Sequence, residues 1–201
     1  MDEWEGIPNI DLAKEIIGVL AQRGVYLTTV RVQKLLYLVE RQHVLDTGGR
    51  AFFLDYRYDR FGMYSPTLNR LIVQLSPAKD HLRVTDITSE RGPGRRIRWV
   101  GKGLALSIPE QLGLAVAKVL SRWGFLDSKT LVDAAKLTAP FIYARKGETL
   151  DWKMLADERC AEDEKLSEEG SRRLREAEER IAEGKYRVFD SPDDVIEYLF
   201  A

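Results

Sequence analysis

The chain has 201 residues, of which 44% are hydrophobic and 31% charged, a composition that supplies a core and excludes wholesale disorder. No run approaches the roughly 18–20 uncharged apolar residues of a membrane helix, and the single cysteine, Cys160, excludes an internal disulfide. The net charge of −1 divides unevenly, since residues 1–150 carry 22 Lys/Arg and 16 Asp/Glu whereas residues 151–201 carry 9 and 16.

This uneven charge predicts two parts. We expect a mildly basic domain over residues 1–150 and an acidic helical tail over residues 151–201. The first residues, MDEWEGIPN, are acidic and short of apolar side chains, unlike a secretory signal peptide. A reducing compartment also fits the single cysteine, so we expect a soluble, cytoplasmic protein with no membrane-bound part.

The first two predicted elements are helices. A helix is predicted over 11–23, with Asp11 as its N-cap and Gly24 as its stop. The second is predicted over 29–46, after an N-cap supplied by one of the two threonines at 28–29. In both segments apolar residues recur at helical spacing, so each helix has one face for a core.

The middle of the domain begins with residues 51–58, AFFLDYRY, whose alternation predicts a short strand or extended segment. Ser65 followed by Pro66 is typical of an N-cap and a first helical residue, and the helix stops before Pro77. Two strands then follow over 81–87 and 95–100, linked by TSERGPG, and the glycines and proline at 92–94 of this link predict a hairpin.

Two more helices are predicted, one over about 109–123 opened by Pro109, and one over about 128–138 capped by Ser128. The tail is highly charged and helix-prone from 162 to 183, with few apolar residues on a narrow stripe. The fold class is therefore mainly α with a small β-hairpin (α+β), a helical domain followed by a helical C-terminal tail. We expect the apolar residues of the tail to bind a partner: Leu166, Leu174, Ile181, Val188 and Phe189.

Catalytic and metal-binding patterns are not found in the sequence. The two histidines, His43 and His81, have no metal-ligand spacing with Cys160 or with paired carboxylates. Glycines at 92–94 and 101–103 lack the spacing of a phosphate loop, and no G-x-S-x-G motif occurs. We therefore expect no enzymatic activity, no metal and no cofactor.

The predicted hairpin is strongly basic. Five cations fall within twelve residues with no acid among them: Arg91, Arg95, Arg96, Arg98 and Lys102. A basic hairpin after helices resembles the wing of a winged-helix protein, which contacts the phosphate backbone through Arg and Lys. The alternative is a solvated hairpin whose arginines pair with the acidic tail. DNA is thus a possible partner.

Two further stretches carry a family resemblance. VQKLLYLVERQHVL followed by FFLDYRYDRFGMYSPTL resembles the Panacea domain and its uncharacterised prokaryotic relatives, over about residues 10–140. Residues 33–37, QKLLY, match the first family motif, and Phe61-Gly62, Ser65 and Leu68 match the second. Met63 replaces a usual proline and Pro66 follows the serine, which are departures from the pattern.

This resemblance implies a largely helical domain with a small β element and no catalytic residues. Many family members are antitoxins that neutralise a toxin protein, and one type hands a toxin to a protease. At the second motif we expect Gly62 to permit a close turn, Ser65 to cap a helix, and the aromatic residues to pack against the second helix. Tyr58 and Tyr64 are the candidates for partner contact there.

The tail carries a weaker resemblance. LREAEERIAEGKYRVFDSPDDVIEYL is similar to the C-terminal segments of small antitoxins, which wrap around the toxin. A narrow apolar stripe flanked by acids also suits folding onto a larger surface. Two alternatives stay open, namely packing of the tail on its own domain and homodimerisation.

Two functional hypotheses follow. The first is a non-enzymatic protein-binding module of antitoxin type that neutralises or sequesters a partner toxin. The second is a winged-helix-like DNA-binding transcriptional regulator. The two are compatible, because antitoxins often repress their own genes.

Overall fold

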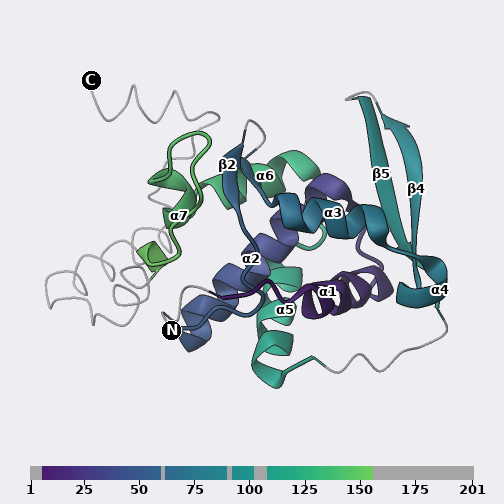
Figure 1. The fold of residues 1–201 in the computed structure, drawn as a ribbon, viewed down its shortest axis with the longest axis horizontal. Helices are drawn as coiled ribbons and strands as arrows, with labels where there is room; N and C mark the ends of the chain where they lie inside the picture. Colours follow the sequence, from purple (N-terminus) through teal and green to yellow (C-terminus); the bar gives the residue numbers. More distant parts are fainter. Residues whose placement is uncertain (1–5, 60–61, 90–91, 102–107, 156–201) are drawn as a thin grey trace, which may run out of the picture. The chain divides into compact units, whose positions relative to one another are not determined.

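The computed structural model describes residues 6–59, 62–89, 92–101 and 108–155, and these form an α+β fold of helices and two small antiparallel sheets (Figure 1). The elements in chain order are α1 (Ile10–Gln22), β1 (Leu27–Thr28), α2 (Thr29–Thr47), β2 (Arg57–Asp59), β3 (Gly62–Tyr64), α3 (Pro66–Gln74), α4 (Pro77–Asp80), β4 (Leu82–Ser89), β5 (Gly92–Trp99), α5 (Glu110–Trp123), α6 (Ser128–Lys136) and α7 (Ala139–Ile142). The prediction of an α+β fold class is confirmed.

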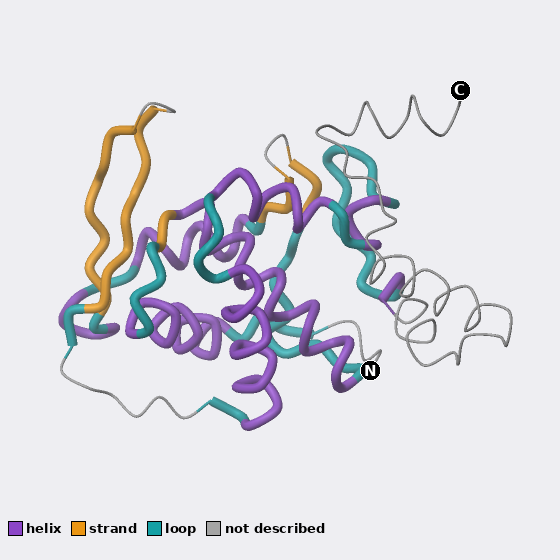
Figure 2. The backbone as a smooth tube through the Cα atoms, turned by 180° about the vertical axis from the view of Figure 1, so that it is seen from behind, coloured by secondary structure: helices purple, strands orange, loops and turns teal. Residues whose placement is uncertain are grey.

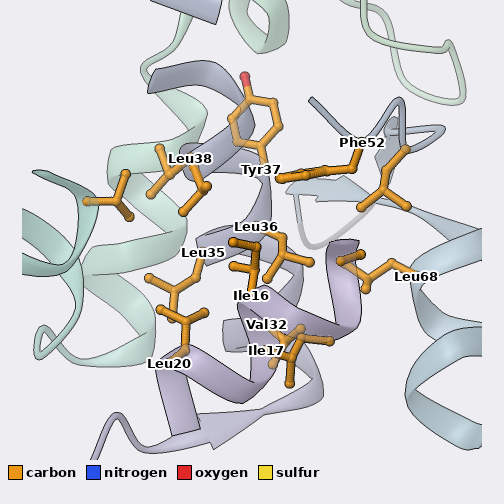
Figure 3. Close-up of a cluster of buried hydrophobic side chains, with 14 of the residues drawn as sticks. Ile16, Ile17, Leu20, Val32, Leu35, Leu36, Tyr37, Leu38, Phe52 and Leu68 are labelled. Carbon is orange, nitrogen blue, oxygen red and sulfur yellow. The ribbon is translucent and has the colours of Figure 1, made fainter. Parts of the chain in front are cut away.

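Helix α2 is the centre of the fold. Residues 31–40 are all buried, because α1, α3, α5 and α6 all contact this helix. Thr28 caps its first turn by accepting a hydrogen bond from the backbone N–H of Arg31, and Gly48 ends it at a φ of 84°, a conformation that glycine adopts without strain. Figure 3 shows the resulting core, in which side chains of α1 and α2 interleave with Phe52 and Leu68.

The larger sheet has the strand order β1-β5-β4. Strands β4 and β5 pair along their whole length, from Leu82↔Trp99 to Ser89↔Gly92. The two residues of β1 reach only Ile97 and Arg96 of β5, so the outer part of the hairpin continues beyond them, as Figure 2 shows. Pro93 lies in this outer part, opposite Thr88.

The helix positions predicted between residues 11 and 138 are confirmed, but two of the predicted caps are wrong. The N-cap of α1 is Asn9, whose side chain accepts from the N–H of Leu12, while Asp11 lies in the first turn, where a carboxylate favours the helix dipole. The N-cap of α6 is Asp127 rather than Ser128, since its carboxylate accepts from two successive backbone N–H groups. The N-cap of α1 therefore lies two residues before the predicted one, and the N-cap of α6 lies one residue before it.

The segment 51–58 is a strand only at its end, from Arg57 onward. The backbone N–H groups of Phe52 and Phe53 donate to the side chain of Glu40 instead of a neighbouring strand, and Phe53 has a φ of 48°. The predicted hairpin is confirmed, but its strands are longer than predicted, because residues 92–94 of the expected linker belong to β5 and pair with Ile87, Thr88 and Ser89 of β4. Short helices α4 and α7 were not predicted.

The described part of the predicted tail is short. Trp152 and Leu155 are buried in the core of the domain, with Leu150 beside them in the sequence. The rest of the tail, including Leu166, Leu174, Ile181, Val188 and Phe189, lies outside the described residues. The helical tail and its partner contacts therefore stay predictions.

Candidate nucleic-acid interface

The hairpin of β4 and β5 has two different faces, because residues directly opposite each other on paired strands point to the same side of a sheet. One face carries the pairs Leu82↔Trp99 and Val84↔Ile97, and it packs on the core, with Leu82 and Ile97 buried. The other face carries the pairs Arg83↔Arg98 and Thr85↔Arg96. We call the side chains of Arg83, Arg96 and Arg98 the arginine face.

The register divides the cations that the sequence predicted. Arg96 and Arg98 share the arginine face, whereas Arg95 lies on the opposite face and forms an ion pair with Asp86, with Nε 3.5 Å from the carboxylate. Arg91 and Lys102 lie outside the described residues. The arginine face also includes Arg83, which sequence reasoning missed.

Among the residues of the three described strands, no acidic side chain lies on the arginine face to compensate its positive charge. Arg83 and Arg98 are both exposed and lie directly opposite each other, an arrangement of like charges that destabilises a sheet. Within the three strands, all of which are described, Asp86 is the single acidic residue, and its carboxylate is on the other face. Two exposed guanidinium groups and the half-buried Arg96, with no acid beside them on these strands, suit the phosphates of a nucleic acid.

A tyrosine lies next to the arginine face. Tyr26 immediately precedes β1, and 48% of its surface is exposed. The guanidinium carbon of Arg96 lies 4.7 Å from the centre of the Tyr26 ring, within the range of a cation–π contact. Arginine and aromatic side chains in contact are typical of surfaces that bind single-stranded nucleic acids.

A groove of about 770 Å³ begins at Tyr26 and separates the outer part of the hairpin from the N-terminal ends of α2 and α6. Its hairpin wall includes Ile87, Pro93, Gly94 and Arg95. Its helix wall is formed at α2 by Thr28, Thr29 and Val30 and at α6 by Asp127 and Ser128. The groove thus combines apolar side chains with one carboxylate at α6, while the guanidinium of Arg95 is paired with Asp86 on the hairpin face opposite the arginine face.

The corner formed by β3 and the start of α3 contains the motif that matched the Panacea pattern. Gly62 has a φ of 87°, and Ser65 caps α3 by accepting from the N–H of Leu68 at 3.0 Å, so both predicted roles are confirmed. The Ser65 hydroxyl also donates to Asp55 at 2.7 Å. Ser65 is fully buried, and the corner is therefore part of the structural framework.

Two polar residues of α2 hold this corner, and they belong to the first motif. The Gln33 amide exchanges two hydrogen bonds with the backbone of Ser65, at 2.9 and 3.0 Å. The ammonium group of Lys34 donates to the carbonyl of Met63 at 2.5 Å. Burial lowers the pKa of Lys34 to about 8, an effect that nearby Asp59 opposes.

The predicted packing role of the aromatic residues at this corner is only partly correct. Tyr58 is half-buried, and its ring contacts that of Phe141 in α7 with centroids 4.3 Å apart. Tyr64 is half-buried as well, and Met63 is the fully buried side chain of β3. Hydrogen bonds from Gln33 and Lys34, more than aromatic contacts, fix the corner to α2.

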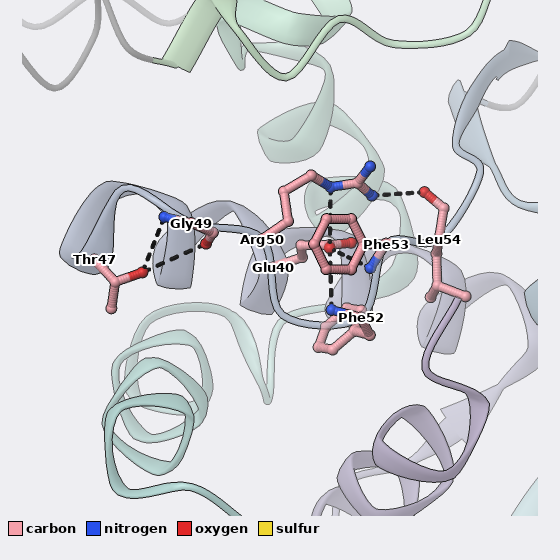
Figure 4. Close-up of polar contacts among 7 residues, drawn as sticks. All are labelled: Glu40, Thr47, Gly49, Arg50, Phe52, Phe53 and Leu54. Atoms are coloured by element: carbon pink, nitrogen blue, oxygen red, sulfur yellow. Dashed lines mark hydrogen bonds and ion pairs between the residues drawn. The ribbon is translucent and has the colours of Figure 1, made fainter. Parts of the chain in front are cut away.

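A buried ion pair fixes the segment that follows α2. Glu40 is fully buried, and one of its carboxylate oxygens accepts from Arg50 at 3.2 Å and from the N–H groups of Phe52 and Phe53 (Figure 4). Burial raises the pKa of Glu40, while Arg50 and the two backbone donors oppose the rise. The Arg50 guanidinium also lies over the Trp152 ring, 4.6 Å from its centre. This network has a structural role.

Other kinds of site find no support within the described ranges. No three His, Cys, Asp or Glu side chains there lie close enough together to hold a metal ion. None of the helices in those ranges is both long and apolar enough to cross a bilayer. Comparison of the chain with protein-family models, with curated proteins and with solved structures found no match.

Proposed function

We propose that the chain binds nucleic acid through the arginine face, with the hairpin serving as the wing of a winged-helix-like domain. The order of elements α1, β1, α2, α3, β4 and β5, with β1 paired to β5 at the base of the hairpin, supports this assignment. The single observation that carries the proposal is the direct opposition of Arg83 and Arg98 on a face without acids. Such repulsion costs folding stability and is relieved when phosphates bind.

The proposed contact is with the phosphate backbone. A helix-turn-helix joins its two helices by about 3–4 residues, whereas here β2, β3 and the residues around them separate α2 from α3. The domain therefore departs from that motif, and base reading by α3 is not part of the proposal. A transcriptional regulator of this kind would rely on the hairpin for affinity.

The proposal is tested by titrating the protein into a fluorescently labelled DNA duplex from the promoter region of its gene and measuring fluorescence anisotropy. Three phosphate contacts predict a slope of about −2.7 in log K against log salt, or a loss of about 40-fold between roughly 50 and 200 mM salt. Arg98→Ala should reduce this slope by about 1. Arg145→Ala removes the same charge from an exposed position outside the hairpin and serves as the control. Equal effects of the two variants would contradict the proposal.

A second candidate function is the binding of a toxin protein, as in antitoxins. The observation that favours it is an exposed apolar surface around α7, where Leu137, Ile142 and Tyr143 are 78%, 58% and 71% exposed. Exposed apolar groups close together in a chain mark surfaces that bind other proteins. The resemblance of the chain to the Panacea domain also supports this function.

Co-expression with the product of the neighbouring gene tests this second function. We expect the two proteins to purify together and the growth defect caused by the neighbour to be relieved. Replacing Leu137, Ile142 and Tyr143 by serine should weaken that complex, while Val73→Ser, at an exposed apolar position on α3, should not. A neighbour that causes a growth defect without being retained or neutralised would rule this function out.

A further inference from the structure

We propose that the groove beside Tyr26 holds an unpaired nucleobase, so that the preferred partner is a nucleic acid with a single-stranded segment. This inference rests on the proposed function, because the arginine face must bind the adjoining phosphates. The groove and the arginine face are continuous, since Tyr26 lines the groove and is in contact with Arg96. A strand that crosses the arginine face therefore reaches the groove directly.

The walls of the groove suit the flat faces of a base. The half-exposed Tyr26 ring provides an aromatic surface, and its contact with Arg96 fixes its orientation. Val30 is 44% exposed at the start of α2, and Ile87 and Pro93 line the groove on the hairpin side. Aromatic and apolar side chains of this kind bind any base, because every base has a π face.

The charges around the groove determine how the bound nucleic-acid strand is oriented. Arg95 lines the hairpin wall, but its guanidinium is paired with Asp86 on the face opposite the arginine face, whereas Asp127 lies on the wall formed by α6, where its carboxylate accepts hydrogen bonds from the backbone N–H groups of Lys129 and Thr130. Phosphates are attracted toward Arg96 beside Tyr26 and repelled from α6. The sugar–phosphate backbone therefore follows the hairpin, and the base points toward the ends of α2 and α6.

The requirement for an unpaired base follows from stacking. Within a duplex both faces of a base are covered by its neighbours, so a protein ring stacks only on bases that are unpaired or at an end. The volume of about 770 Å³ lies within the range of about 300–1,000 Å³ for sites that take small molecules, which accommodates one nucleotide or two. A closed duplex would instead contact the arginine face alone.

The test compares two labelled DNAs that share one duplex of about 20 base pairs, one blunt and one with a single-stranded overhang of about six nucleotides, a length within the site sizes of single-strand binders. We expect the overhang to raise affinity about fivefold or more. Tyr26→Ala should lower affinity for the overhang DNA by about 5- to 100-fold and leave the blunt duplex unaffected. Tyr26→Phe should retain the preference, and Tyr143→Ala is the control for loss of an exposed tyrosine.

A second measurement is independent of affinity. Photo-cross-linking of an overhang that carries 5-iodouracil should join the base to Tyr26, or to a residue lining the groove, as identified by mass spectrometry. The inference is overturned if both DNAs bind equally, or if Tyr26→Ala changes neither affinity, while Arg98→Ala still weakens binding. The proposed function itself fails if neither DNA binds, or if Arg98→Ala and Arg145→Ala behave alike.

Discussion

Replacing Arg98 by glutamate tests whether the arginine face lowers the stability of the fold while it serves nucleic-acid binding. The substitution removes the repulsion between Arg83 and Arg98 and places a carboxylate directly opposite Arg83. A cross-strand pair contributes about 0.2–1 kcal/mol, and exposure to solvent keeps the effect toward the lower end. We expect the free energy of unfolding to rise by about 0.5 kcal/mol.

The same substitution should weaken nucleic-acid binding. It removes one phosphate contact and adds a charge that repels phosphate, so the salt dependence should lose about one unit of slope. Stability is measured by urea denaturation and by the melting temperature, where about 0.5 kcal/mol corresponds to an increase of about 1–2 °C for a chain of this size. Binding is measured by fluorescence anisotropy with the labelled promoter duplex.

Arg98→Gln provides the matched reference, because it removes the repulsion without adding a carboxylate. Its stability should fall between those of the original chain and Arg98→Glu. If Arg98→Glu instead lowers stability by about 1 kcal/mol or more, the arginine stabilises the fold and the reasoning from repulsion is wrong. If stability rises but binding is unchanged, the arginine face is not the binding surface.

Three further predictions concern the framework around α2. The pKa of Lys34 is about 8 in the folded chain and about 10.5 in the unfolded chain, so the unfolded chain binds more protons between these two pH values. The free energy of unfolding of the original chain, compared with that of Lys34→Met, should therefore rise from pH 8 to pH 10.5 by up to about 3 kcal/mol, as measured by urea denaturation. Ser65→Ala removes the N-cap of α3 and should cost about 1–2 kcal/mol in the same assay, whereas Ser121→Ala, at an exposed site, should cost little. Glu40→Ala leaves Arg50 buried without its partner and should cost about 3–5 kcal/mol, and a cost below 1 kcal/mol would show that the pair is solvated.

The elements of the fold were largely predictable from local patterns. Apolar spacing located α1, α2, α3, α5 and α6, and Ser65-Pro66 marked the start of α3. The segment around Phe53 was not predictable in this way, because its backbone donors are satisfied by Glu40, a side chain on another element. Tertiary hydrogen bonds of this kind leave no periodic signal in a sequence.

The arginine face was only partly predictable, because the sequence pattern defined no register between the two strands. Clustered cations indicated Arg96 and Arg98, but they did not show which residues of the other strand lie opposite them. The observed pairing puts Arg83 opposite Arg98 and Arg95 opposite Asp86. The missing information was thus the register, which decides which side chains share a face.

The place of Pro93 has a consequence for how copies of this hairpin behave at high concentration. The outer part of β5 does not pair with β1. An edge strand of this kind can pair with the same edge of another molecule and so extend into an intermolecular sheet. Pro93 has no backbone N–H to donate, so a strand from another molecule cannot form an unbroken series of hydrogen bonds along this edge. A long hairpin can in this way extend beyond the body of the domain without starting the growth of fibres.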